Sequence, residues 1–127
     1  MDTDDKVEIG KVFHRSLQKR DWPAMRVLLT EDVKWTLPGD NQISGTVLGV
    51  NEVTARAEKI ASFGLHFELL HVLVSRDNFA LSLHNTATRD GRTLDEFLAT
   101  VCRLRDGKIA EIETYLSDVT GMNAFFA

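Results

Sequence analysis

Two carboxylates near the end of the chain are the side chains best placed to do chemistry. Glu96 lies in the strand-like run 94–104, on a face where the neighbouring side chains are apolar, and Asp118 follows the next apolar run, 108–116. A carboxyl group in an apolar cavity holds its proton more tightly than in water, so it can serve as a general acid or base. Glu96 and Asp118 are therefore the candidate catalytic residues, with proton transfer as their chemistry.

Each carboxylate also has a structural interpretation. Glu96 can lie at an open end of the fold, solvated or paired with an arginine, and Asp118 can cap the turn in the sequence SDVTG. An unpaired carboxylate on an apolar face is costly, which favours the functional interpretation of Glu96. For Asp118 the turn-capping interpretation is favoured.

Two hairpins position Glu96. The tetrapeptides RDGR at 89–92 and RDGK at 105–108 each contain Asp-Gly, a strong signal for a tight turn between strands. A two-residue first turn pairs Glu96 with Asn85, whereas a bulged three-residue loop pairs it with His84, and both alternatives remain open. A bulged second hairpin puts Ile112, Thr114 and Leu116 on the same face as Leu98 and Thr100.

The remaining elements are predicted from hydrophobic periodicity and from residues that cap or end helices and strands. Helical spacing predicts a helix over 5–18, a shorter one in DWPAMRVLL with Asp21 as its cap, and a third that Asn51 caps and Gly64 ends. DVKWTLPGD predicts a strand that stops at Pro-Gly, and ISGTVLGV an extended segment. Four antiparallel strands in a meander follow Gly64. The order predicts an α+β domain in which N-terminal helices cover one face of a curved, antiparallel-rich sheet.

The two faces of this meander differ in composition. One face is apolar except for Asn85 and Glu96, so it should look toward an internal pocket. The opposite face is too apolar for open water and too small-sided for a second layer of helices. It predicts a homodimer formed by packing of two sheets. Its members are Ala80, Ser82, His84, Phe97, Ala99, Val101 and Tyr115.

Length, composition and net charge exclude several classes of protein. The 127 residues predict a single domain spanning 1–127, and 43% hydrophobic with 27% charged residues indicate a globular protein. The net charge of −4, without a basic cluster, argues against nucleic acid. One cysteine, an acidic N-terminus and no long apolar run predict a cytoplasmic location without membrane contact. No pair of histidines has ligand spacing backed by a carboxylate, so no metal is expected.

Several segments together resemble a known superfamily: RDW, EDVKWTLPG, SGTVLGVNEV and RDGRTLDEFLATVCRLRDGKIAEIETYLSD. They resemble the nuclear transport factor 2-like proteins, and within them the SnoaL-like and ketosteroid-isomerase-like groups, over nearly the whole chain. The resemblance implies a cone of helices around a curved sheet, one internal pocket and a homodimer. The expected pocket residues are Phe13, Trp35, Leu37, Leu83, Asn85, Leu98, Thr100, Ile112, Thr114 and Leu116.

The same resemblance limits the chemistry. The ketosteroid isomerase base falls on Leu37, and its two oxyanion donors fall on Phe13 and Thr100, so steroid isomerisation by that mechanism is excluded. The acid-base Asp of SnoaL-like cyclases falls nearest to Asp118. The resemblance therefore implies a cofactor-independent isomerase, cyclase or dehydratase acting on a hydrophobic, ring-bearing or polyketide-like metabolite. The alternative is a non-catalytic ligand-binding or assembly domain, and ionisable groups converging on the pocket would distinguish the two.

Overall fold

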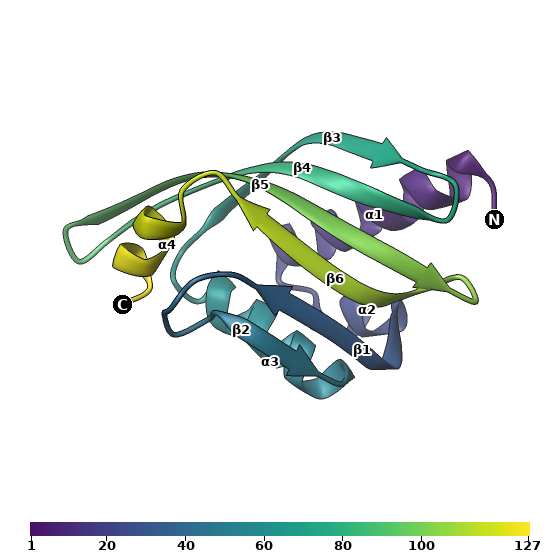
Figure 1. Ribbon diagram of the computed structural model, residues 1–127, viewed down its shortest axis with the longest axis horizontal. Helices are drawn as coiled ribbons and strands as arrows, with labels where there is room; N and C mark the ends of the chain where they lie inside the picture. Colours follow the sequence, from purple (N-terminus) through teal and green to yellow (C-terminus); the bar gives the residue numbers. More distant parts are fainter.

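The computed structural model describes all 127 residues, which form four helices and one six-stranded sheet (Figure 1). Three helices and two further strands precede the predicted meander, and a fourth helix follows it. In chain order the elements are α1 (Thr3–Lys19), α2 (Trp22–Val27), β1 (Leu29–Leu37), β2 (Gly45–Leu48), α3 (Val50–Ala61), β3 (His66–Val74), β4 (Asn78–Arg89), β5 (Arg92–Arg105), β6 (Lys108–Leu116) and α4 (Val119–Phe125).

The sheet has the strand order β2-β1-β6-β5-β4-β3. Strands β3 to β6 form the antiparallel meander predicted from the sequence. Strand β1 pairs in parallel with β6, a contact between distant segments that no local pattern indicates. Helix α1 contacts β3 and β4 and helix α3 contacts β1 and β2, so the two helices cover opposite ends of one sheet face (Figure 1). The predicted α+β class with helices on a mostly antiparallel sheet is confirmed.

The hairpin registers settle the alternative that the sequence left open. Asn85 lies opposite Glu96 across a two-residue turn in which Asp90 and Gly91 both have positive φ, of 52° and 76°. The second hairpin also turns tightly, and its bulge lies beyond the turn, where the register shifts between Arg103 and Leu104. The bulge places Thr114 opposite Thr100 and Leu116 opposite Leu98, so these residues share one face, as predicted.

The helix ends agree with the sequence in part. Asp21 caps α2 by accepting a hydrogen bond from the Ala24 amide. Asn51 does not cap α3, because the helix begins at Val50 and the Asn51 side chain instead accepts from Arg26. Helix α3 ends at Ala61, earlier than Gly64, which has a φ of +81° in the following turn. The sequence predicts only a turn at SDVTG, whereas the structure forms helix α4 there. No helix combines the length and apolar character needed to cross a membrane.

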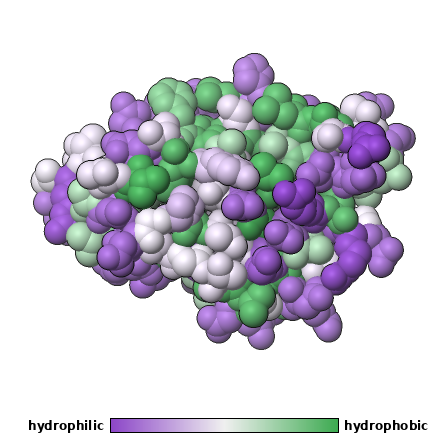
Figure 2. Space-filling view, in the orientation of Figure 1, coloured by the Kyte–Doolittle hydropathy of each residue, from purple (hydrophilic) through white to green (hydrophobic).

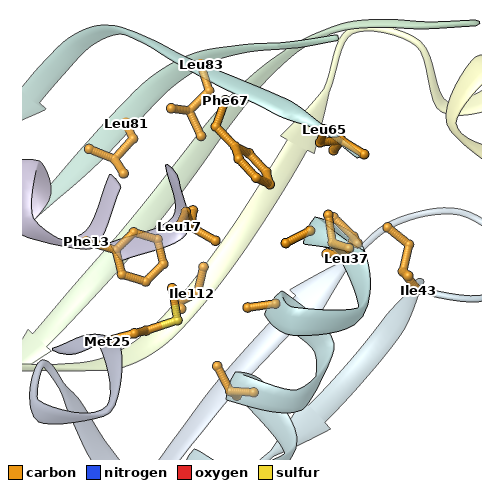
Figure 3. Packing of buried hydrophobic residues seen from close by; sticks show 14 of the residues in the cluster. Phe13, Leu17, Met25, Leu37, Ile43, Leu65, Phe67, Leu81, Leu83 and Ile112 are labelled. Carbon is orange, nitrogen blue, oxygen red and sulfur yellow. The ribbon is translucent and has the colours of Figure 1, made fainter. Parts of the chain in front are cut away.

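The hydrophobic core fills the space between the helices and the sheet (Figure 3). Side chains from α1, α2, β1 and β3 point toward one another there, including Phe13, Met25, Leu37 and Phe67. Burial of one such side chain contributes about 1.5–3 kcal/mol. Cys102 is fully buried in this core, and its burial raises the pKa of the thiol, which makes it an inert packing residue.

Candidate functional site

An interior cavity of about 50 Å³ lies between the helices and the sheet, and 15 of its 18 lining residues are hydrophobic. Side chains from all four helices and from five strands form its wall, and Figure 3 shows many of them. The residues are Phe13, Leu17, Met25, Trp35, Leu37, Ile43, Val53, Ala57, Ile60, Leu65, Phe67, Leu83, Asn85, Leu98, Thr100, Ile112, Thr114 and Met122. None of them is ionisable.

The structure brings most of the expected pocket residues together around this cavity. Phe13, Trp35, Leu37, Leu83, Asn85, Leu98, Thr100, Ile112 and Thr114 all line it. Leu116 does not; it is partly buried at the end of β6. The sequence missed the helical half of the wall, which includes Leu17, Val53, Ala57 and Met122. The helical periodicity of α1 and α3 marked their apolar faces as buried, but it could not show that these faces border a void.

Asn85 is the one cavity residue with an unsatisfied buried polar atom. Its side chain is 4% exposed, and its Oδ1 has no hydrogen-bond partner. The neighbouring polar pair is satisfied, because the Trp35 indole Nε1 donates to Thr114 Oγ1 over 3.0 Å. An unpaired buried amide oxygen costs about 1–3 kcal/mol. Asn85 therefore offers a hydrogen-bonding group to whatever enters the cavity.

Glu96 is buried on the predicted face but does not line the cavity. The residue is 1% exposed, and its Oε1 accepts a hydrogen bond of 2.8 Å from the backbone amide of Asp118. Burial is the main cause that raises the pKa of this carboxyl group, and the nearby Asp118 charge adds to it. The expectation that Glu96 projects into the cavity is corrected: the side chain lies beneath the junction of β6 and α4, where it holds the chain in place.

Neither of the expected partners of Glu96 bonds to it. Asn85 is its cross-strand neighbour, yet the oxygen of Asn85 stays unpaired. His84 lies on the other face, between Asp95 and Glu68, with Nε2 2.5 Å from the first carboxylate and Nδ1 3.3 Å from the second. These carboxylates raise the pKa of the His84 imidazole, Asp95 most strongly.

Asp118 is exposed and caps α4. Its Oδ1 accepts a hydrogen bond of 2.9 Å from the Gly121 amide, so the capping interpretation of SDVTG is confirmed. The two candidate catalytic carboxylates thus meet at the start of α4 rather than at the cavity. The cavity can enclose an apolar group and offer it one amide, and its own wall supplies no acid or base.

Comparison with known proteins gives a consistent family and fold. The sequence profile of the SnoaL-like domain matches residues 11–112. No curated protein matches the chain. The chain is similar to Bal32a, from a soil-derived mobile gene cassette, at 23% identity and a TM-score of 0.93, with 98% of each chain covered.

Two further solved structures are similar to it. One is a protein of unknown function with a cystatin-like fold from Xanthomonas campestris, with 28% identity, a TM-score of 0.86 and coverage of 96% of this chain and 98% of the other. The second is TerC, co-crystallised with polyporic acid, with 17% identity, a TM-score of 0.83 and the same coverage. The profile match spans most of the chain, and the fold agrees over nearly all of it. The chain therefore belongs to the SnoaL-like domain family, and its fold is the cystatin-like, nuclear transport factor 2-like fold.

Proposed function

We propose that this protein binds a small, mostly apolar, ring-bearing molecule in its interior cavity, with Asn85 as the hydrogen-bonding anchor. The observation that carries the proposal is the unpaired Oδ1 of a buried Asn85 in a wall that is otherwise almost wholly apolar. Ligand pockets commonly combine an apolar lining with a few polar groups that fix orientation. A donor on the ligand would satisfy the Asn85 oxygen, which no protein group does.

The cavity must expand to accept such a molecule. Its volume of about 50 Å³ is small beside the ~300–1,000 Å³ of typical ligand pockets. Two of its lining residues are the methionines Met25 and Met122, whose unbranched side chains can change rotamer at low cost. Met122 belongs to α4, a seven-residue helix at the end of the chain. Repacking of these two side chains is the expected route to a larger pocket.

The similarity to TerC supports a ring-bearing ligand, because that protein was crystallised with polyporic acid. The SnoaL-like family assignment supports ligand binding or isomerase-type chemistry at the level of the family.

Titration with a matched pair of small rings tests the proposal. Phenol carries a hydroxyl that can donate to Asn85, and toluene has similar size without it. In NMR titrations we expect cavity methyl groups to shift with both, with phenol bound more tightly. The advantage is the net value of one hydrogen bond, about 0.5–1.5 kcal/mol or up to about tenfold in affinity.

The variant Asn85→Leu should reverse this preference, and it should be more stable than wild type by about 1 kcal/mol because a buried unpaired polar group is removed. Ser82→Ala, on the opposite face of the same strand, is the matched control and should bind like wild type. Equal phenol affinity in Asn85→Leu and wild type would disprove the anchoring function of Asn85. No response of the cavity methyl groups to either ring would disprove the binding proposal.

Proton-transfer catalysis is the second candidate function. The observation in its favour is that Glu96, with its raised pKa, lies directly across the strand pair from Asn85. As an acid-base group it would act in isomerisation, cyclisation or dehydration of the bound ring. Glu96 does not line the cavity, and its Oε1 is bound to the Asp118 amide, so catalysis would need this contact to rearrange. Binding without turnover is therefore the function that the geometry supports best.

A further inference from the structure

A second hollow lies beside α3 and is distinct from the interior cavity, although Ile43 lines both. Val53 and Ala57 of α3 line the cavity, whereas other residues of the same helix line a groove of about 230 Å³ beside β2 and the preceding loop. The groove is lined by Gln42, Ile43, Ser44, Val47, Glu52, Ala55, Arg56 and Lys59. It plays no part in the proposed function above.

Arg56 gives this groove an unusual charge. The residue is only 6% exposed, and its guanidinium lies over the Trp35 ring, 4.9 Å from the ring centroid. Nη2 donates to the Gly45 carbonyl over 2.8 Å, but Nη1 is buried without any hydrogen-bond partner. Burial lowers the pKa of the Arg56 guanidinium, and no neighbouring carboxylate offsets this effect. A buried cation without a counter-ion is costly, and a neutral side-chain amide would suffice to hold the Gly45 carbonyl.

The surrounding side chains add positive charge. Lys59 follows Arg56 by three residues on the same helix, and its Nζ makes only a long contact of 3.4 Å with the Gln42 carbonyl. Glu52 is the single acid in the lining, and it precedes Arg56 by four residues, the spacing at which helical ion pairs form. Glu52 and Arg56 nevertheless form no ion pair, so the lining holds two cations against one carboxylate.

We propose that this groove is a binding site for an oxyanion, a phosphate or a carboxylate, held between Arg56 and Lys59. The planar guanidinium presents paired donors that match two oxygens of such a group, and a neighbouring ammonium adds a point charge. The anion would supply the counter-ion that Arg56 lacks. The guanidinium would turn over the Trp35 ring so that the buried Nη1 donates to the anion.

NMR titration of the isotope-labelled protein tests this site. Inorganic phosphate and acetate are added in separate series, with sodium chloride at matched ionic strength as the reference. We expect saturable shifts of the amides at 42–45 and 52–59 with at least one of the two anions and not with chloride. The anion that binds more tightly shows whether the site prefers a tetrahedral phosphate or a planar carboxylate. Arg56→Gln should weaken binding by about tenfold or more, since charge-assisted hydrogen bonds are lost.

Three further variants keep the result interpretable. Glu52→Gln removes the competing charge and should strengthen binding, whereas Arg56→Lys keeps the charge but loses the paired donors and should weaken it. Lys11→Gln, an exposed change on α1, is the control and should bind like wild type. The same shifts with chloride, or unchanged affinity in the folded Arg56 variants, would overturn the site and leave Arg56 as a structural link to Gly45. If both Arg56 variants fail to fold, unchanged or weaker affinity in Glu52→Gln overturns it.

Discussion

At the scale of the residue, the hydrogen bond from the Asp118 amide to Glu96 decides what a buried carboxylate does in this protein. The amide gives Glu96 a structural function at the junction of β6 and α4. Below pH 4.5, where Glu96 keeps its proton, we expect Glu96→Gln to lie close to wild type in unfolding free energy, because the amide oxygen still accepts this bond. Glu96→Leu removes the acceptor and should cost about 1–3 kcal/mol. Urea unfolding of both variants measures the difference, and equal stability of the two would contradict the structural function.

The raised pKa of Glu96 also predicts how stability depends on pH. A carboxyl group with a higher pKa in the folded than in the unfolded state keeps its proton longer in the folded state. Stability is then lost as pH rises from the ordinary value of 4.5 through the folded pKa. Wild type should therefore lose stability relative to Glu96→Gln over this window. Urea unfolding of both proteins at several pH values checks the sign, and parallel pH profiles would contradict it.

The sequence predicts the face and the pairing of these residues, but not their hydrogen-bond partners. Alternation of apolar side chains placed Asn85 and Glu96 on the concave face, and the Asp-Gly turn placed them opposite each other, because both signals are local. The hydrogen-bond partner of Glu96 could not be predicted from local patterns. Glu96 bonds to an amide 22 positions later in the chain, and that amide is positioned by a helix that the sequence did not predict.

At the scale of the element, α4 is the part that most changes the site. Its Met122 lines the cavity, and its Phe125 packs edge-on against Phe126, which in turn contacts Phe63. Seven residues give fewer than two helical turns, too few for a periodic pattern to emerge, and SDVTG reads equally well as a turn. The parallel pairing of β1 with β6 was missed for a related reason, since it depends on packing between distant segments.

Loss of the Asp118 cap should loosen this helix. Asp118→Ala removes the acceptor for the Gly121 amide, and such substitutions typically cost about 0.5–2 kcal/mol. We expect faster hydrogen exchange at residues 121–126 while the meander keeps its protection. Asp21→Ala, which removes the cap of α2, is the matched control and should speed exchange in α2 alone. Unchanged exchange at 121–126 in Asp118→Ala would show that packing of Phe125 and Phe126 alone holds α4.

At the scale of the whole molecule, the two faces of the sheet differ in what covers them. The concave face and the helices enclose the core and the cavity. On the outer face Phe97 is 52% and Tyr115 53% exposed, and Figure 2 shows hydrophobic residues over β3 and β4 in the same view as Figure 1. The alternation that predicted both faces is a local property, so the sequence could assign each residue to its side. It could not show that α4 contributes Met122 to the cavity wall, because the sequence does not predict this helix.

Exposure of this outer face predicts a homodimer in which two sheets pack against each other. Phe97 stacks on the His84 ring at 4.3 Å between centroids, and Val101 lines a shallow groove with Leu73 and Ala80, so the face offers both flat aromatic and concave apolar surface. We expect light scattering to report twice the monomer mass at micromolar concentration. Val101→Glu should yield monomer, because it would bury a charge in an apolar contact.

The control for this prediction is Lys19→Glu, a charge change on α1 away from the sheet, which should leave the dimer intact. Circular dichroism of Val101→Glu must match wild type, so that loss of the dimer reports the interface and not the fold. If the wild type is already monomeric at micromolar concentration, the outer face is not a self-association surface. Its exposed aromatic residues would then have to be tested against a different partner, beginning with the His84 and Phe97 pair, where aromatic surface and titratable charge meet.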